Sequence, residues 1–340
     1  MTTVAVPRRH KPRIGFLGVG WIGRNRLEAL ARSGLLEIAA VADPVIENSQ
    51  AAGDTAGCEA LGSLSELLDR ELEGVVIATP SALHAEQAIA ALEVGVAVFC
   101  QKPLARTARE TASVVAAARS ADRLLGVDLS YRFVDGVRQI RDLIRAGELG
   151  TVYAVDLVFH NAYGPDKRWF YDPALSGGGC VIDLGSHLVD LALWILEPTA
   201  VVGASSRLFA RGDPLGSRPD IVEDYAVAQL DLEDGSVVRL SCSWNLPAGQ
   251  DAVIEASFYG TAGGAALRNV AGSFYDFAAE RFQGTSRQSL SRPPDDWGAK
   301  AALDWAQRLS SGEGFDPDAE QYIDLAAAID LLYGRDGSSR

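Results

Sequence analysis

The first part of the chain alternates short apolar runs with segments in which apolar residues recur every three or four positions. The runs predict buried strands and the recurrences predict helices. Ser63-Leu-Ser-Glu66 and Thr107-Ala-Arg-Glu110 are capping boxes that mark helix starts. Strands that alternate with helices at this spacing predict a parallel, doubly wound α/β sheet. The predicted strands are 14–17, 37–42, 74–78, 97–100 and 124–128, and the predicted helices include 24–33, 82–94 and 108–121.

From about residue 150 the pattern changes to consecutive strands without helices between them. Asp234-Gly235 is a hairpin signal inside this series. The second half therefore predicts an α+β domain with a large, mostly antiparallel open sheet and helices on one face. Its predicted strands are 152–160, 200–207, 223–231, 237–244, 251–259 and 265–269, its helices are 137–146, 181–195, 297–309 and 319–332, and 209–220 and 284–296 are surface loops.

A glycine-rich turn joins the first predicted strand to the first helix. Gly18, Gly20 and Gly23 stand in the GxGxxG spacing, which lets a dinucleotide's pyrophosphate approach the helix N-terminus. Asp43 ends the second strand, where an acid binds ribose hydroxyls and repels a 2′-phosphate. The turn and this acid predict NAD in preference to NADP. The structural alternatives are a glycine turn and a helix-capping Asp43 before Pro44.

Three loops follow the carboxyl ends of predicted strands, where doubly wound sheets bind ligands. They are Thr79-Pro80, Gln101-Lys102-Pro103 and 130–132. Lys102 is placed to contact a hydroxyl near the nicotinamide, although an exposed lysine there needs no functional explanation. His84 begins a helix in the same region, and we interpret it as structural more than catalytic. The predicted cofactor-binding residues are Gly18, Gly20, Trp21, Ile22, Gly23, Asp43, Thr79, Pro80, His84, Gln101 and Lys102.

The segment 176–190 combines three glycines with an apolar helical pattern. Asp183 and His187 are four residues apart, so on a helix they share one face. A carboxylate beside an imidazole can orient it and raise its basicity. The alternative is a buried histidine capped by its neighbour.

The loop 161–175 is rich in polar and aromatic side chains. Aromatic faces stack on sugar rings, and amide or guanidinium groups donate to hydroxyls. A well-packed surface loop is the alternative. The predicted substrate-binding residues are Tyr131, Arg132, Asn161, Arg168, Trp169, Asp183, His187 and Trp244.

The amino-acid composition argues against several classes of binding partner. Lys plus Arg is 31 against 45 for Asp plus Glu, a net charge of −14, which argues against nucleic acid and anionic membranes. No apolar run approaches the about 18 residues of a membrane span. The Arg8-Arg9 pair precedes a glycine-rich strand and turn that the fold needs, so we reject a signal peptide. Four dispersed cysteines predict reduced thiols, no metal site and a cytoplasmic protein.

Together these motifs resemble the Gfo/Idh/MocA family of glucose–fructose oxidoreductase and inositol dehydrogenase-like enzymes, from residue 14 to about 333. The resemblance rests on the glycine turn, Ala78-Thr79-Pro80 with His84, 101–103, Tyr131-Arg132-Phe133 and 177–187. It implies that Lys102, Asp183 and His187 meet around the substrate carbon. The chain departs from the family pattern at Gln101, where a glutamate is usual.

We therefore predict a disordered tail (1–12), an NAD-binding Rossmann domain (13–132) and an α+β domain (133–340) that binds substrate and forms a homodimer or homotetramer through its open sheet. The predicted reaction moves a hydride between NAD and a secondary hydroxyl or ketone of a sugar, nucleotide-linked sugar or cyclitol. His187 exchanges the hydroxyl proton, Asp183 orients the substrate and Lys102 polarises the oxygen. An NAD-assisted glycosidase or lyase and a non-catalytic NAD- and sugar-binding regulator are the alternatives.

Overall fold

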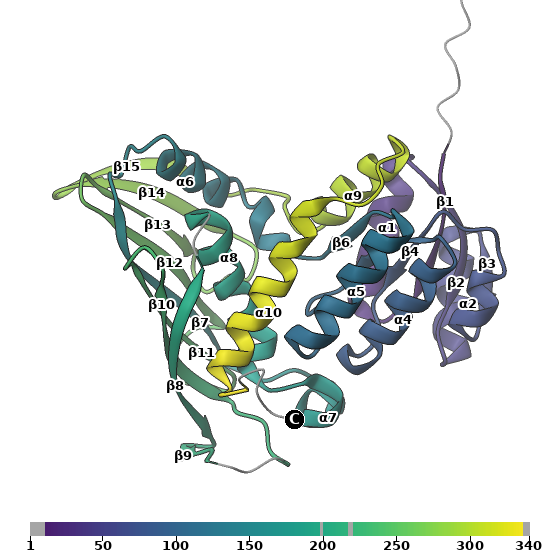
Figure 1. The fold of residues 1–340 in the computed structure, drawn as a ribbon, viewed down its shortest axis with the longest axis horizontal. Helices are drawn as coiled ribbons and strands as arrows, with labels where there is room; N and C mark the ends of the chain where they lie inside the picture. Colours follow the sequence, from purple (N-terminus) through teal and green to yellow (C-terminus); the bar gives the residue numbers. More distant parts are fainter. Residues whose placement is uncertain (1–10, 198–199, 217–219, 336–340) are drawn as a thin grey trace, which may run out of the picture.

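The computed structural model describes residues 11–197, 200–216 and 220–335. Two sheets lie at opposite ends of the molecule, and helices fill the space between them (Figure 1). Residues 1–10 of the predicted tail, 217–219 of the predicted loop 209–220, and 198–199 and 336–340 of the predicted second domain lie outside the described residues.

The first sheet confirms the predicted Rossmann-like architecture. Over the described residues it contains six parallel strands in the order β3-β2-β1-β4-β5-β6. Its two faces are covered by different helices, because apolar residues from α1, α2 and α9 form one core and those from α3, α4 and α5 form another. The elements are β1 (Arg13–Leu17), α1 (Trp21–Ser33), β2 (Glu37–Ala42), α2 (Ile46–Ala56), β3 (Glu59–Leu61), α3 (Leu64–Leu68), β4 (Gly74–Ile77), α4 (Ser81–Glu93), β5 (Ala97–Cys100), α5 (Ala108–Ala121) and β6 (Leu125–Val127).

The second sheet is mostly antiparallel, as predicted. In the part of the chain that the structure describes, nine strands run in the order β15-β14-β13-β12-β7-β11-β10-β8-β9, and β7 and β11 are parallel. The strands are β7 (Val152–Asn161), β8 (Val201–Ala210), β9 (Asp213–Pro214), β10 (Tyr225–Leu232), β11 (Val237–Ser243), β12 (Ala252–Gly260), β13 (Gly264–Asn269), β14 (Phe277–Gln283) and β15 (Ser286–Ser291). The helical elements of this half are η1 (Ser130–Phe133), α6 (Asp135–Arg145), η2 (Arg168–Tyr171), α7 (Pro173–Ser176), η3 (Val181–Gly185), α8 (Ser186–Leu196), α9 (Lys300–Ser310), η4 (Pro317–Glu320) and α10 (Gln321–Leu332).

Two predicted loops contain strands. The segment 284–296 was expected to be a surface loop, but β15 pairs there with β14, and β9 forms a short pair inside 209–220. Strand β15 is Ser-Arg-Gln-Ser-Leu-Ser, a polar edge strand with exposed side chains, so it shows no apolar alternation. Its backbone pairing, and not its side chains, makes it a strand.

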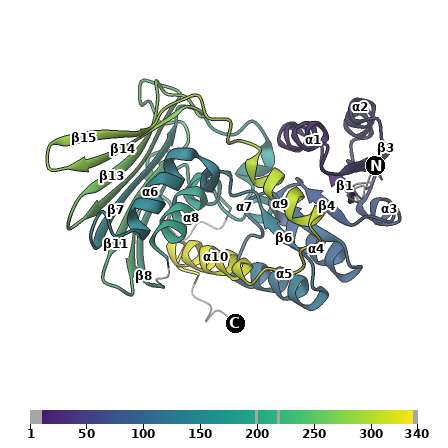
Figure 2. The ribbon, with the colours of Figure 1, turned by 90° about the horizontal axis from the view of Figure 1, so that it is seen from above.

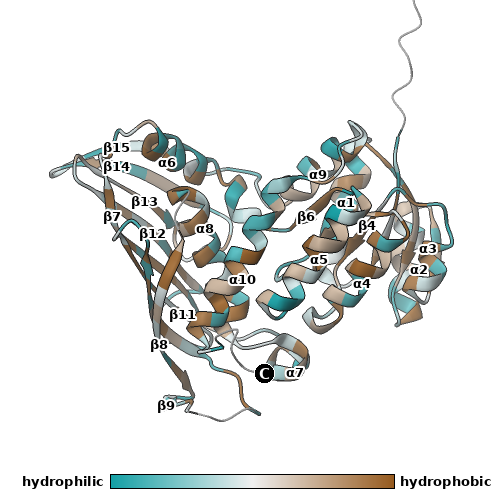
Figure 3. Cartoon of the chain, viewed as in Figure 1, coloured by the Kyte–Doolittle hydropathy of each residue, from teal (hydrophilic) through white to brown (hydrophobic). Residues whose placement is uncertain are grey.

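Helices cover only one face of the second sheet. Apolar residues of α6, α8 and α10 pack on it and form one core with the inward residues of the strands (Figures 1 and 3). The other face carries the ion pairs Asp156–Arg239 and Glu255–Arg268 beside exposed Val227. The uncovered face thus combines charged pairs with exposed apolar side chains.

The last two long helices return to the first domain. Helix α9 packs against the first sheet, where Trp305 contacts the Phe99 ring at a centroid distance of 5.7 Å. Helix α10 lies beside α5, as both ribbon views show (Figures 1 and 2). The C-terminal part of the predicted second domain thus ties the two sheets together.

One helical stretch is long and apolar enough to cross a membrane. Among the described residues this is the 24-residue stretch Pro173–Leu196, whose most apolar 18-residue window has a mean hydropathy of 1.6, contrary to the expectation that no such run exists. Of its most apolar window, 78% is buried inside the protein, where α8 packs between the second sheet and α10. This stretch serves as a core helix of the second domain.

Candidate active site

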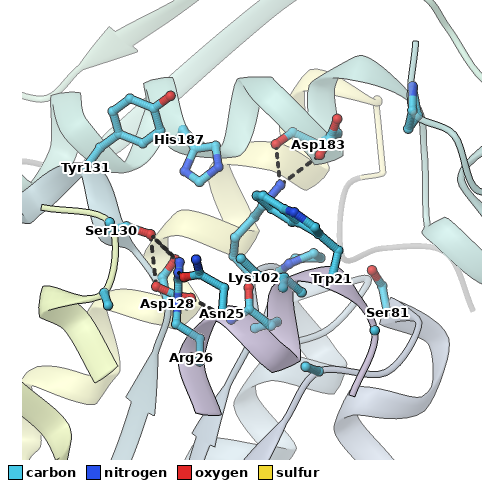
Figure 4. A pocket seen from close by; sticks show the side chains of 18 of the residues that line it. Trp21, Asn25, Arg26, Ser81, Lys102, Asp128, Ser130, Tyr131, Asp183 and His187 are labelled. Carbon is cyan, nitrogen blue, oxygen red and sulfur yellow. Dashed lines mark hydrogen bonds and ion pairs between the residues drawn. The ribbon is translucent and has the colours of Figure 1, made fainter. Parts of the chain in front are cut away.

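A cavity of about 880 Å³ lies between the two domains. The glycine turn and the loops after β4, β5 and β6 line one side, and segments 165–187 and 295–303 line the other. Figure 4 shows that Lys102, Asp183 and His187, which are distant in sequence, face this cavity together. The predicted site residues that line it are Gly20, Trp21, Ile22, Thr79, Pro80, His84, Gln101, Lys102, Tyr131, Trp169, Asp183 and His187.

The glycine turn has the shape that a phosphate-binding loop needs. Gly18 has a φ of +84°, and a Cβ there would lie 2.6 Å from the Ala78 carbonyl oxygen. By contrast, a Cβ on Gly20 would meet no atom within 4 Å, so the turn is open in front of the helix. Helix α1 has no side-chain cap, and its first N–H groups are free to bind an anion.

The Asp43 carboxylate binds the backbone of this turn on the side away from the cavity. Its carboxylate accepts hydrogen bonds from the backbone N–H groups of Val19 at 3.0 Å and Val45 at 2.9 Å. It is 7% exposed and lies outside the cavity lining, as do Gly18 and Gly23. Asp43 therefore fixes the backbone of the turn but does not cap the next helix, because α2 begins at Ile46 with Val45 at its N-cap and has no side-chain cap. The capping alternative is not met, and a role of Asp43 toward ribose stays a prediction.

His84 joins two of the loops that line the cavity. Its ring nitrogens lie 2.7 Å from the carbonyl oxygens of Thr79 and Pro103. Burial lowers the pKa of His84, and the two carbonyl oxygens oppose this effect. These contacts support the structural interpretation, because the imidazole fixes the loops that carry Pro80 and Lys102.

The three-glycine segment is fixed by a buried carboxylate. Glu223 accepts hydrogen bonds from the backbone N–H groups of Gly179 and Val181 and from the Tyr333 hydroxyl, and its own carbonyl accepts from Cys180. A Cβ on Gly179 would lie 1.9 Å from that carbonyl oxygen, so only glycine fits. The next residues form the wide turn η3, a π-helix, which carries Asp183. Such turns inside helices often occur at functional sites.

Asp183 lies at the centre of a hydrogen-bond network across the domain boundary. The Lys102 ammonium donates to its Oδ1 at 2.8 Å and to its carbonyl oxygen at 2.6 Å. The Trp244 indole N–H donates to its Oδ2 at 3.0 Å. An ammonium has three N–H donors, so one donor of Lys102 remains for a ligand.

His187 lies one turn further along, but Asp183 does not orient it. No hydrogen bond joins the two residues among those described, which corrects the expected carboxylate–imidazole pair. The imidazole instead packs against the Tyr131 ring at a centroid distance of 4.8 Å (Figure 4). Burial and then the Lys102 charge hold the pKa of His187 well below its usual range, so the ring is neutral near pH 7.

Several predicted substrate-binding residues lie away from the cavity lining. Arg132 forms a buried ion pair with Asp190 of α8, which orients the guanidinium into the core. Asn161 bonds in the sheet through its backbone, and its buried Oδ1 has no hydrogen-bond partner within the described chain. Arg168 is also absent from the lining, and Trp244 reaches it only through Asp183. The structure therefore places Arg132 and Asn161 outside the cavity lining, and their contact with a substrate stays a prediction.

The cavity also contains residues that the sequence patterns did not single out. Asp128 directly follows β6, so the rule of strand carboxyl ends could have found it. Residues 295–303 follow the second sheet in the chain and include the start of α9. No local pattern shows that this helix returns to the cavity. The additional lining residues used below are Asn25, Arg26, Asp128, Ser130, Asp166, Lys167, Asp295 and Lys300.

Metal binding finds no support within residues 11–197, 200–216 and 220–335. No group of three or more His, Cys, Asp or Glu side chains there could hold a metal ion. The cavity instead offers a helix N-terminus, one ammonium donor and a neutral imidazole, which together suit proton and hydride transfer to an anionic cofactor.

Comparison with known proteins follows the same division of the chain. Residues 12–129 match the oxidoreductase family with an NAD-binding Rossmann fold, and 137–266 match the GFO/IDH/MocA C-terminal domain. The chain is 34% identical over 260 residues to the rhizopine catabolism protein MocA of Rhizobium meliloti, covering 75% of this chain and 78% of that protein. It is 25% identical over 319 residues to inositol 2-dehydrogenase 3 of Saccharopolyspora erythraea, covering 93% and 85%. Levoglucosan dehydrogenase in complex with NADH has the same fold, with a TM-score of 0.81 at 20% identity over 96% and 97% of the chains.

The neighbouring ammonium predicts how His187 titrates. Lys102→Met removes a positive charge and leaves Asp183 without its cation, so the protonated imidazole becomes less unfavourable and the pKa of His187 rises. NMR titration of the histidine ring protons, assigned with His187→Ala, measures this change. Lys300→Met, whose ammonium pairs with Asp295, is the control and leaves the His187 pKa closer to wild type. An unchanged pKa in Lys102→Met would contradict the electrostatic coupling.

Proposed function

This chain belongs to the Gfo/Idh/MocA family of oxidoreductases, and from that premise we propose that it is an NAD-dependent dehydrogenase acting on a secondary hydroxyl of an uncharged sugar or cyclitol. The observation that supports it best is the meeting of Lys102, Asp183 and His187 on one cavity that also borders the open glycine turn. NAD bound at this turn supplies the acceptor for a hydride.

The residues around the turn fit this cofactor. The uncapped N-terminus of α1 and the open space before Gly20 suit a pyrophosphate, which backbone N–H groups bind without basic side chains. The cavity volume of about 880 Å³ leaves room for a substrate beside a nicotinamide.

Each catalytic side chain has one task in this proposal. Neutral His187 accepts the hydroxyl proton of the substrate during oxidation and returns it during reduction. Lys102 donates its remaining N–H to the same oxygen and stabilises the charge that develops there. Asp183 holds the ammonium in place, and only its unused lone pairs are available to orient a substrate hydroxyl.

The charges of the cavity support an uncharged substrate. Each cation in its lining already has a carboxylate partner, so a phosphate on the substrate would have to compete with that carboxylate. The competition is strong at the buried pairs of Arg26 and Lys102 and weak at the exposed pairs of Lys167 and Arg32. Hydroxyls need no such competition, and Trp169 offers an aromatic face. The ion pairs are Arg26–Asp128, Lys102–Asp183, Lys167–Asp166, Lys300–Asp295 and Arg32–Glu28.

The test begins with a panel of free sugars and cyclitols, together with their phosphorylated and nucleotide-linked counterparts, scored by NADH formation. The uncharged members are expected to give the higher kcat/KM. With the best substrate, His187→Ala should lower kcat by roughly 10²–10⁴-fold, the usual contribution of a general base. NAD binding and melting temperature should stay close to wild type.

His160→Ala is the matched control, because His160 lies on the uncovered face of the second sheet and bonds Ser243. An active His187→Ala enzyme, or one that is inactive only because it no longer folds, would remove His187 from the mechanism. Substrate turnover without net NADH would favour an NAD-assisted lyase or hydrolase, and binding without turnover would favour a regulator.

The proposed preference for NAD over NADP rests on the Asp43 carboxylate. It sits behind the turn, and Pro44-Val45-Ile46 after it offers no cation for a 2′-phosphate. Asp43→Ala should weaken NAD by roughly tenfold through the loss of a charged acceptor, and NADP much less. The ratio of kcat/KM for the two cofactors measures this. A higher wild-type kcat/KM with NADP would contradict the proposal.

We also propose that the protein is a homodimer or homotetramer formed through the uncovered face of the second sheet. Val202 on β8, Val227 on β10 and Tyr259 on β12 are exposed at 64%, 44% and 39% on strands of this sheet. Light scattering at micromolar concentration should give a multiple of 36.1 kDa, and Val227→Asp should lower it. Val94→Asp, at an exposed site on the first domain, should not. A wild-type monomer would refute this.

The cellular location is proposed to be the cytoplasm. All four cysteines are free thiols, and the sulfur atoms of Cys180 and Cys242 lie 3.8 Å apart without a bond. A reducing compartment is compatible with this arrangement.

A further inference from the structure

A buried polar cluster lies beneath the cavity on the side of the glycine turn. Its members come from three elements: Arg26 from α1, Gln101 from the end of β5, and Asp128 and Ser130 from the end of β6. All four line the cavity and are at most 8% exposed. Figure 4 shows Arg26, Asp128 and Ser130 as one bonded group.

The Asp128 carboxylate is the centre of this cluster. Its Oδ2 accepts from Arg26 Nε at 2.6 Å and from Gln101 Nε2 at 2.5 Å. Its Oδ1 accepts from the Ser130 hydroxyl at 2.9 Å. Because a carboxylate has only acceptors, the amide atom of Gln101 that faces it must be the NH₂ group. The amide oxygen of Gln101 is therefore directed away from Asp128.

The Arg26 guanidinium offsets the free-energy cost of burying the Asp128 carboxylate. An isolated buried carboxylate would be strongly unfavourable, but the guanidinium neutralises Asp128 at hydrogen-bond distance. Arg26 is itself held by Asn25 Oδ1 at 2.6 Å. The cluster is thus neutral overall and rigid, with one acceptor, the Gln101 oxygen, left over.

We infer that Asp128, neutralised by Arg26, is a positioning residue that fixes the Gln101 amide so that its oxygen accepts a hydrogen bond from the nicotinamide half of the cofactor. The donor is the ribose hydroxyl or the carboxamide N–H. This inference rests on the proposed use of NAD. It explains why a glutamine suits position 101 here: a second carboxylate 2.5 Å from Asp128 would face a like charge in a buried site.

According to this inference, the amide and the carboxylate at positions 101 and 128 can be exchanged together, but neither position can be changed alone. In Gln101→Glu, two carboxylates must share a proton, so one pKa rises. The folded protein then binds a proton that the unfolded chain releases above about pH 4.3. Stability of the apo-protein should therefore fall as pH rises from 5.5 to 8.5, and more steeply than in wild type.

Moving the carboxylate from position 128 to position 101 should restore NAD binding. Gln101→Glu/Asp128→Asn keeps one carboxylate for Arg26, one amide donor between the two residues, and an acceptor toward the cavity. We expect Gln101→Glu and Asp128→Asn each to weaken NAD binding at least about fivefold at pH 8, and the double variant to return within about twofold of wild type. Quenching of tryptophan fluorescence measures NAD binding, and melting temperatures from pH 5.5 to 8.5 measure the apo-protein.

Gln101→Met tests the acceptor without a charge change and should also weaken NAD at least about fivefold. The analogue 3-acetylpyridine adenine dinucleotide lacks the carboxamide N–H. If the carboxamide is the donor, Gln101→Met weakens NAD but not this analogue. If the ribose hydroxyl is the donor, it weakens both.

Gln229→Glu is the control, because Gln229 also donates to an aspartate, Asp231 at 2.7 Å, but on an exposed strand. It should leave NAD binding and the pH dependence unchanged. Single variants that bind NAD like wild type, or a double variant as weak as the sum of the single ones, would overturn the inference. A wild-type protein that does not bind NAD would instead overturn the proposed function.

Discussion

The ion pair between Lys102 and Asp183 is the contact on which the rest of the site depends. It joins the end of β5 in the first domain to the π-turn η3 in the second, so it closes the cavity across the domain boundary. Both side chains are mostly buried, with exposed fractions of 18% and 16%. In such surroundings an unpaired charge is costly, so the ion pair favours the arrangement in which the two residues meet.

The two sides of this pair are supported by different means. On the first domain, hydrogen bonds of His84 hold the loop after β5. On the second, Glu223 binds the backbone around Gly179, and the Trp244 indole binds Asp183 from the sheet. Since a misplacement of about 1 Å is enough to slow a reaction strongly, this support contributes to catalysis without touching a substrate.

Local patterns were sufficient for the first domain and for the residues at strand ends. The period of apolar residues, the glycine turn and the capping boxes are all local signals, and β1, β2, β4, β5 and β6 follow them. The three-residue strand β3 was not predicted, because it is too short to show a pattern. The edge strand β15 could not be predicted because its side chains are polar and only backbone pairing defines it. Arg132 shows a related limit: its partner Asp190 is 58 positions away, so no local pattern could predict that its guanidinium pairs with this carboxylate.

The same limit applies to Asp183 and His187, whose spacing suggested a carboxylate that orients an imidazole. The structure commits both carboxylate oxygens of Asp183 to donors, Lys102 on one and Trp244 on the other. Each oxygen of this carboxylate thus already accepts a hydrogen bond. His187 has no such donor among the described residues, and burial together with the Lys102 charge keeps it neutral. In the proposed reaction the network therefore separates the two tasks: Asp183 fixes the ammonium that would stabilise a negative oxygen, and His187 is the group free to accept its proton.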